Sequence, residues 1–303
     1  MKNLNFVISN KVRKALKNNR PIVALESTLI SHGLPYPTNL EVAKSSVNAV
    51  ELSGSVAANI AIIKGKIKIG LNDDDMQILA NSRNVDKVSR HNLAIAISNK
   101  NNAATTVAST IYLASLIGIK FFATGGIGGV HLNGEKTFDV SSDLNELSKT
   151  NMNVVCSGAK SILDLDKTYE KLETLGISRI GYNTDFMPGF WYYQTNKKVD
   201  FNYKLIENLT DYIKVREKIK QNGSVLIFNP VPKDKGIDKK LIDKWIKSSI
   251  KKASKKLING KELTPFLINE INILSKNKTL KANMELIINN ALIAGKIASE
   301  YYD

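Results

Sequence analysis

Runs of consecutive apolar residues alternate along the chain with stretches in which apolar positions recur at helical spacing. A short run in which nearly every residue is apolar is typical of a strand that is buried on both faces. Such runs cover residues 21–25, 119–124, 153–156, 180–183 and 225–229. Because helical patterns separate them, the alternation indicates an α/β fold with a largely parallel sheet.

Helix boundaries are expected where capping residues meet these helical patterns. Thr38 and Glu41 form a Thr-x-x-Glu pattern that predicts a capping box at the start of a helix over residues 38–52. Asn72 is expected to cap a short helix that begins with aspartates. Further helices are predicted over residues 104–117, over residues 161–175, and through most of the C-terminal part.

Residues 56–63 and 66–71 predict a hairpin that turns at Lys64 and Gly65. No internal repeat, Pro- or Ser-rich linker or low-complexity segment interrupts the sequence. We therefore expect one domain over residues 1–303, with a three-layer α/β/α fold, a largely parallel central sheet and a helical C-terminal part.

The composition narrows the cellular setting. Of the 303 residues, 43% are hydrophobic, which is ample for a buried core. The single cysteine, Cys156, excludes an internal disulfide and a cysteine-based zinc site, and it suits a reducing compartment. No signal-peptide pattern is evident at the N-terminus, and the longest apolar region, residues 103–130, is interrupted by Lys120 and by glycines. The sequence predicts a cytoplasmic protein without a membrane span.

The formal net charge of +15 favours anionic ligands. Many lysines fall in residues 234–261, on the outside of predicted helices, where they are typical of a solvated basic face. We therefore expect no nucleic-acid partner. A module that binds nucleotides or nucleic acid is the alternative from a different class, and it predicts salt-sensitive binding.

Two candidate features follow buried strands. A glycine-rich run directly follows Thr124: Gly125-Gly126-Ile127-Gly128-Gly129. Such a run would let the backbone approach a ligand closely and cradle a phosphate, or it would form a tight structural turn. Glu26 ends the first core strand, at the edge where open α/β sheets bind ligands, although a surface acid would look the same.

Lys160 falls in the turn between a predicted strand and the helix predicted from residue 161. The positive end of that helix and partial burial would both disfavour the ammonium form. A neutral amine is what Schiff-base chemistry requires. Because the chain has 43 Lys and Arg residues, a solvated surface lysine is the alternative.

Residues 137–143 combine two acids, Asp139 and Asp143, with the hydroxyls of Ser141 and Ser142. Oxygen donors of this kind can hold a hard cation. One of the serines could equally be the N-cap of a helix.

Taken together, these segments resemble the pseudouridine-5′-phosphate glycosidases, also called the indigoidine synthase A-like family. The matching stretches are residues 24–28, 31–37, 87–90, 104–110, 122–131, 137–139, 155–164, 181–182, 229–230, 264–267 and 289–291. Each motif is weak by itself, but their ordered set spans nearly the whole chain and is specific.

The resemblance implies a role for each matching position. Lys160 matches the Schiff-base nucleophile, Glu26 the proton donor, and Asp139 the ligand of a divalent metal, usually Mn²⁺. The other matching positions bind or surround the substrate: Lys87, Val107, His131, Ser141, Ser142, Asp143 and Asn283. The run at 141–143 is usually Ser-Ala-Asp, so Ser142 departs from the pattern by one oxygen.

The activity that the resemblance implies is the reversible cleavage of the C–C glycosidic bond of pseudouridine 5′-phosphate, which gives uracil and ribose 5-phosphate. It also implies a cytoplasmic homotrimer with a small-molecule substrate. An enzyme of the same fold that acts on another C-nucleoside or phosphosugar is the alternative.

Overall fold

The structure is a computed structural model that describes residues 6–82, 84–258 and 263–303. Its strands form one sheet, in which nine follow the order β1-β4-β3-β2-β7-β8-β11-β9-β10, while β6 pairs with β3 and β5 pairs with β6. The strands are β1 (Phe6–Ile8), β2 (Ile22–Leu25), β3 (Val56–Ile63), β4 (Lys66–Ile69), β5 (Asp86–Val88), β6 (Ala103–Thr105), β7 (Phe121–Ala123), β8 (Asn153–Cys156), β9 (Ser178–Tyr182), β10 (Phe201–Tyr203) and β11 (Val225–Phe228).

The sheet is largely parallel. Strand β3 runs antiparallel to β4 and β6, and the other pairings between described strands are parallel. The four neighbouring central strands β2, β7, β8 and β11 therefore end at one edge of the sheet. Open α/β sheets bind ligands at the carboxyl ends of their strands, so this edge is where a site is expected.

Helices cover both faces, which gives the three layers predicted from the sequence. They are α1 (Asn10–Lys17), α2 (Thr38–Leu52), α3 (Asp73–Asn81), α4 (Leu93–Ser98), α5 (Val107–Ser115), α6 (Gly134–Thr137), α7 (Ser142–Lys149), α8 (Leu165–Thr174), α9 (Ile206–Lys218), α10 (Lys239–Lys255), α11 (Leu263–Leu274) and α12 (Lys278–Tyr302), with a single π-helical turn η1 at Leu29–Gly33. The fold class, a mixed α/β sheet with mostly parallel strands and C-terminal helices, is confirmed.

Alternation along the strands explains the two layers of helices. In β2, Ile22 and Ala24 belong to the core cluster that also holds buried residues of α1, α5, α7 and α8. Val23 and Leu25 point the other way and pack with residues of α2, α9 and the C-terminal half of α12. Since successive side chains of a strand face opposite sides of the sheet, a strand buried on both faces must be apolar throughout.

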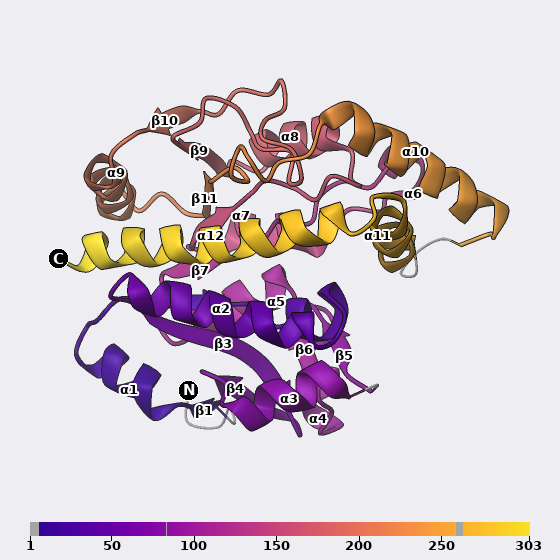
Figure 1. Cartoon of the computed structure of the whole chain (residues 1–303). Coiled ribbons are helices and arrows are strands. Elements are labelled where there is room, and N and C mark those ends of the chain that lie inside the picture. The colour runs from indigo at the N-terminus through magenta and orange to yellow at the C-terminus, as the bar shows by residue number, and fades with distance from the viewer. Residues whose placement is uncertain (1–5, 83, 259–262) are drawn as a thin grey trace.

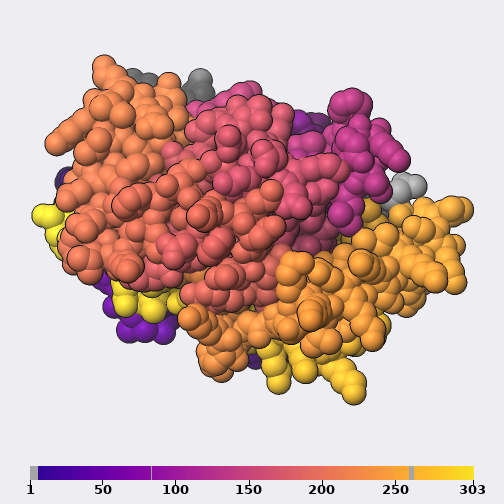
Figure 2. Space-filling view, turned by 90° about the horizontal axis from the view of Figure 1, so that it is seen from above, coloured from indigo at the N-terminus to yellow at the C-terminus, as the bar shows by residue number. Residues whose placement is uncertain are grey.

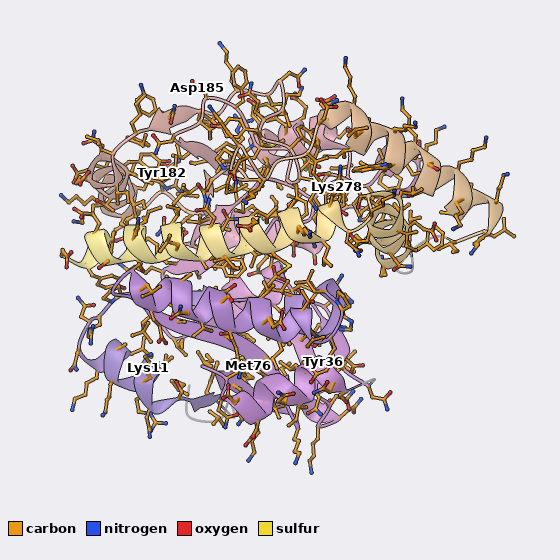
Figure 3. All side chains as sticks on the ribbon, in the orientation of Figure 1. Lys11, Tyr36, Met76, Tyr182, Asp185 and Lys278 are labelled. Carbon is orange, nitrogen blue, oxygen red and sulfur yellow. The ribbon has the colours of Figure 1, made fainter. Side chains whose placement is uncertain are left out.

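The long helix α12 crosses the middle of the molecule, with α2 alongside it (Figure 1). Helices α10 and α11 pack against each other and project to one side, as both views show (Figures 1 and 2). Figure 3 labels Tyr36, in the loop before α2, and Lys278, the first residue of α12; both lie toward the end of the molecule that carries α11. No described helix combines the length and apolar character that crossing a membrane requires.

Two local predictions are confirmed. Strands β3 and β4 form the predicted hairpin, and both Lys64 and Gly65 at its turn have positive φ angles of 50° and 71°. Asn72 caps α3, because its side chain accepts a hydrogen bond from the backbone N–H of Asp75 at 2.8 Å.

Three helix starts differ from the prediction. Thr38 is already the first residue of α2, whose N-cap is Pro37, and no side-chain capping bond forms, so the predicted capping box is wrong. The helix predicted from residue 104 begins at Val107, because Ala103–Thr105 instead pairs with β3 and β5 as strand β6. The helix predicted from residue 161 begins at Leu165.

Candidate active site

A cavity of about 180 Å³ lies at the carboxyl edge of the central strands. Its lining includes residues that follow β2, β7 and β8, Lys87 of β5, and residues of α11 and α12. Four residues predicted from the sequence meet on this cavity: Glu26, Lys87, Lys160 and Asn283. They are far apart in the sequence, and the sheet topology brings them together.

The carboxylate of Glu26 is held from both sides. Its Oε1 accepts a hydrogen bond from the hydroxyl of Thr124, which follows β7, and its Oε2 accepts one from the hydroxyl of Thr28. The carbonyl of Thr124 in turn accepts a hydrogen bond at 2.8 Å from the fully buried amide of Asn290. These contacts fix a half-buried carboxylate on the cavity, where it can exchange a proton with a bound ligand.

Lys160 lies on the loop between β8 and α8. The loop is anchored to the glycine-rich segment, because the N–H of Lys160 donates to the carbonyl of Ile127 at 3.2 Å. Helix α8 starts five residues later with Asp164 as its N-cap, whose side chain accepts from the N–H of Lys167 at 3.0 Å. Lys160 is therefore not beside a helix N-terminus, and the argument from the helix dipole is wrong.

A second lysine shares the cavity with Lys160. Burial around the Lys87 amino group, and then the nearby charge of Lys160, lower the pKa of Lys87, while the carboxylates of Asp143 and Glu26 act in the opposite direction. The residue as a whole is exposed, and it is also one of the residues that line the cavity. Lys87 therefore lies within the electrostatic influence of one lysine and two carboxylates.

Asp143 is buried and bonded to the backbone. Its Oδ1 accepts from the N–H of Ala108 at 3.0 Å, and its Oδ2 accepts from the N–H of Gly128 at 2.9 Å. The side chain of Ser141 caps α7 by accepting from the N–H of Asp143 at 3.2 Å, so the N-cap interpretation is confirmed for Ser141. The hydroxyl of Ser142 lies 2.6 Å from that of Ser89.

Ser141, Ser142, Asp143 and the buried Val107 form a layer beside the cavity, and none of them lines it. The glycine loop passes against this layer. A Cβ on Gly128 would lie 2.1 Å from the hydroxyl of Ser141 and 2.7 Å from a carboxylate oxygen of Asp143. On Gly126, a Cβ would lie 2.6 Å from the ring of Phe190. Close packing therefore requires glycine at both positions, which supports the tight-turn interpretation of the run.

Asp139 is the candidate metal ligand. Its side chain is 45% exposed, and its Oδ2 lies 3.8 Å from Nδ1 of His131. In the part of the chain that the structure describes, no three His, Cys, Asp or Glu side chains come together as a metal cluster. A single exposed carboxylate fits a divalent ion that keeps most of its water ligands, and it does not fit an ion bound mainly by protein groups.

Several lining residues escaped the sequence analysis. Thr124 directly follows β7, and Thr28 lies three residues after the end of β2, so both stand near the carboxyl end of a core strand, and this position was a usable signal. His32 also lines the cavity, and burial, followed by the charge of Lys87, lowers its pKa. Phe190 and Trp191 lie on an irregular segment between β9 and β10, where no sequence pattern marks them.

Two known proteins of similar sequence share one name with each other, pseudouridine-5′-phosphate glycosidase. The pseudouridine-5′-phosphate glycosidase of Petrotoga mobilis is 48% identical over 294 residues, which are 97% of this chain and 96% of that protein. The pseudouridine-5′-phosphate glycosidase of Staphylococcus aureus is 47% identical over 290 residues, 96% of this chain and 94% of that protein.

Solved structures agree over the whole fold. The crystal structure of a prealnumycin C-glycosynthase in complex with ribulose 5-phosphate matches with a TM-score of 0.92 and 32% identity, covering 99% of this chain and 98% of that chain. An indigoidine synthase A-like protein from Thermotoga maritima matches with a TM-score of 0.90 and 31% identity, covering 99% of this chain and 97% of that one. The family model described as indigoidine synthase A like protein matches residues 11–300, so the chain belongs to this family.

Proposed function

We propose that this chain is a pseudouridine-5′-phosphate glycosidase, an enzyme that separates uracil from ribose 5-phosphate by cleaving a C–C glycosidic bond. The observation that carries the proposal is the meeting of Lys160, Lys87 and Glu26 on one cavity at the carboxyl edge of the sheet. The names of the relatives from Petrotoga and Staphylococcus support the substrate. The C-glycosynthase with a bound phosphosugar supports C-glycoside chemistry.

Cleaving a C–C glycosidic bond needs more than protonation of a leaving oxygen or nitrogen, because the base leaves from carbon. In the proposed first step, the neutral amine of Lys160 attacks C1′ of the sugar. The bond from C1′ to the ring oxygen breaks, and that oxygen takes up a proton. The lysine nitrogen is then bound to C1′ of a ring-opened sugar.

In the second step, the nitrogen lone pair forms a C=N bond to C1′ while the bond from C1′ to C5 of the base breaks and C5 accepts a proton. Uracil leaves, and a Schiff base of ribose 5-phosphate remains on the lysine. Water then hydrolyses this Schiff base and regenerates the amine. Glu26, fixed by Thr28 and Thr124, is the group that we assign to the proton transfers.

Lys87 is assigned to the anionic substrate. Its ammonium is disfavoured by burial and by Lys160, so an incoming phosphate would give it a favourable partner. We assign the layer formed by Val107, Ser141, Ser142 and Asp143 to holding the backbone around the substrate in place, since the Asp143 carboxylate already accepts two backbone N–H groups.

A hydrated Mn²⁺ ion held by Asp139 would contribute positive charge near the substrate phosphate when it is bound. We assign His131, which lies beside Asp139, to the same part of the site, around the ion and the substrate.

The test is to incubate the purified protein with pseudouridine 5′-phosphate and Mn²⁺ and to measure free uracil. Uridine 5′-phosphate, in which the base is attached through nitrogen, serves as the matched control substrate. We expect uracil from the C-nucleotide and none from the N-nucleotide. Absence of uracil together with consumption of another phosphorylated C-glycoside would favour the second candidate, an enzyme of the same fold with a different substrate, which the C-glycosynthase relative supports.

A further inference from the structure

Trp191 and Asn283 make a hydrogen bond at the wall of the cavity. The indole N–H of Trp191 donates to the side-chain oxygen of Asn283, on α12, at 2.8 Å. Both residues line the cavity that holds Glu26 and Lys160. An indole N–H can only donate, so the atom of the Asn283 amide that faces it must be the oxygen. The orientation of this amide is therefore set by chemistry.

The indole itself is firmly held. Trp191 is 1% exposed, and its ring packs against that of Phe190 with 5.5 Å between centroids. The backbone of Trp191 is fixed as well, because its carbonyl accepts a hydrogen bond from the N–H of Ile237 at 2.8 Å. The indole N–H is therefore held in one direction.

The same segment is tied to the loop of the proposed nucleophile. Ser161 directly follows Lys160, and its hydroxyl donates to the carbonyl of Gly189 at 2.6 Å. The backbone N–H of Trp191 donates to that hydroxyl at 3.3 Å. A short chain of contacts therefore fixes the position of the Asn283 amide relative to Lys160.

The amide NH₂ of Asn283 is left for a ligand. Across residues 6–82, 84–258 and 263–303, Trp191 is the one hydrogen-bond partner of the Asn283 side chain, and the amide nitrogen is not among the buried atoms without a partner. With its oxygen turned to the indole, the amide presents two N–H donors on the side away from Trp191. The complementary ligand atom is an acceptor such as a carbonyl oxygen.

We propose that Trp191 is a positioning residue that holds the Asn283 amide as a donor to a carbonyl oxygen of the base, so that the site selects uracil over a base with an amino group at that position. This inference rests on the proposed function. Uracil carries carbonyl oxygens at C2 and C4, whereas cytosine carries an amino group at C4. If cytosine were bound, its amino group and the Asn283 amide would be two donors that face each other, and both would stay unpaired. A site built to donate to a carbonyl oxygen therefore discriminates strongly against a base with an amino group there.

The test compares inhibition by uracil and by cytosine of the cleavage of pseudouridine 5′-phosphate, followed as release of ribose 5-phosphate, in wild type, Trp191→Phe and Asn283→Asp. In wild type we expect uracil to inhibit at least about tenfold more strongly than cytosine. Trp191→Phe removes the indole N–H, so the amide can rotate and the ratio should fall by about tenfold, the effect of one lost hydrogen bond. Asn283→Asp replaces the donors with acceptors and should move the preference toward cytosine.

The ratio separates positioning from a general loss of structure. A loosened cavity would weaken both bases together, and Phe190→Leu, which changes packing without removing a polar hydrogen, should keep the wild-type ratio. A wild-type ratio in both Trp191→Phe and Asn283→Asp would overturn the inference while leaving the proposed function intact. If wild type releases no uracil from pseudouridine 5′-phosphate, the proposed function fails. Calorimetry with uracil and cytosine in the presence of ribose 5-phosphate then tests the base preference directly.

Discussion

The carboxylate of Asp143 accepts a hydrogen bond from the backbone N–H of Gly128 at 2.9 Å. Its second oxygen accepts from the N–H of Ala108, at the start of α5, at 3.0 Å. The residue is 7% exposed. Asp143 therefore joins the glycine loop to α5, and a position that the family resemblance assigns to substrate binding also holds the backbone of the site together.

Asp143→Asn should lower the free energy of unfolding. The amide keeps the shape of the side chain, but its NH₂ must face one of the two backbone N–H donors, and that donor is left unsatisfied. We expect a loss of about 1–3 kcal/mol, measured by urea unfolding. Asp211→Asn, at an exposed position on α9, is the matched control and should change stability by less than about 0.5 kcal/mol. Equal stability of the two variants would contradict this role for Asp143.

Lys87→Met should stabilise the protein and impair substrate binding. Because the folded-state pKa of Lys87 is lowered, its charge reduces stability at neutral pH, and this penalty disappears as pH rises through the lowered pKa toward 10.5. We expect the variant to be more stable than wild type at pH 7, because it no longer carries a charge that burial disfavours. The gain over wild type should shrink in alkaline solution.

The measurements for Lys87→Met are urea unfolding at several pH values and the KM for pseudouridine 5′-phosphate, which should rise. Lys14→Met removes an exposed lysine of α1 and should show neither effect. A variant of Lys87 that is less stable than wild type at pH 7 would contradict the assigned balance of burial and charge.

Glu26→Gln should slow turnover without weakening ligand binding. One of the hydroxyls of Thr28 and Thr124 can rotate to accept from the amide NH₂ while the other still donates to the amide oxygen, so the position of the side chain is retained, but an amide cannot transfer protons. We expect kcat to fall by about a hundredfold or more. Binding of ribose 5-phosphate, measured by calorimetry, should be unchanged. The opposite pattern, weak binding with normal kcat, would make Glu26 a binding residue.

Exhaustive chelation should abolish activity, and Mn²⁺ should restore it. Asp139 offers one exposed carboxylate, so the ion should be weakly held, and Asp139→Asn should raise the Mn²⁺ concentration needed for half-maximal activity by about tenfold or more. Asp211→Asn serves again as the charge-matched control. Full activity after chelation would exclude the metal from the mechanism.

Much of the sheet was predictable because its central strands are buried on both faces. The apolar runs at β2, β7, β8 and β11 identified these strands, and the position of Glu26 after β2 followed from the chain itself. The family resemblance then singled out Lys87 and Asn283, which also line the cavity, although no local pattern marks either residue.

Other features depend on contacts that sequence periodicity does not contain. Ala103–Thr105 is a strand because β3 and β5 pair with it, although the residues continue a helical pattern. Residues 161–164 stay outside α8 because Ser161 bonds to Gly189 and Asp164 caps the helix. The single domain, the homotrimer, the cytoplasmic location and the Mn²⁺ ion stay predictions.

The central claim is that Lys160 forms a Schiff base with the ring-opened sugar phosphate, and reduction with borohydride during turnover tests it most directly. Peptide mass spectrometry of the wild-type protein, treated in the presence of pseudouridine 5′-phosphate, should find one ribose 5-phosphate adduct, on Lys160 and not on the neighbouring Lys87. Lys160→Arg should give neither adduct nor uracil, because a guanidinium stays protonated. An adduct on another lysine, or normal uracil release by Lys160→Arg, would contradict the account.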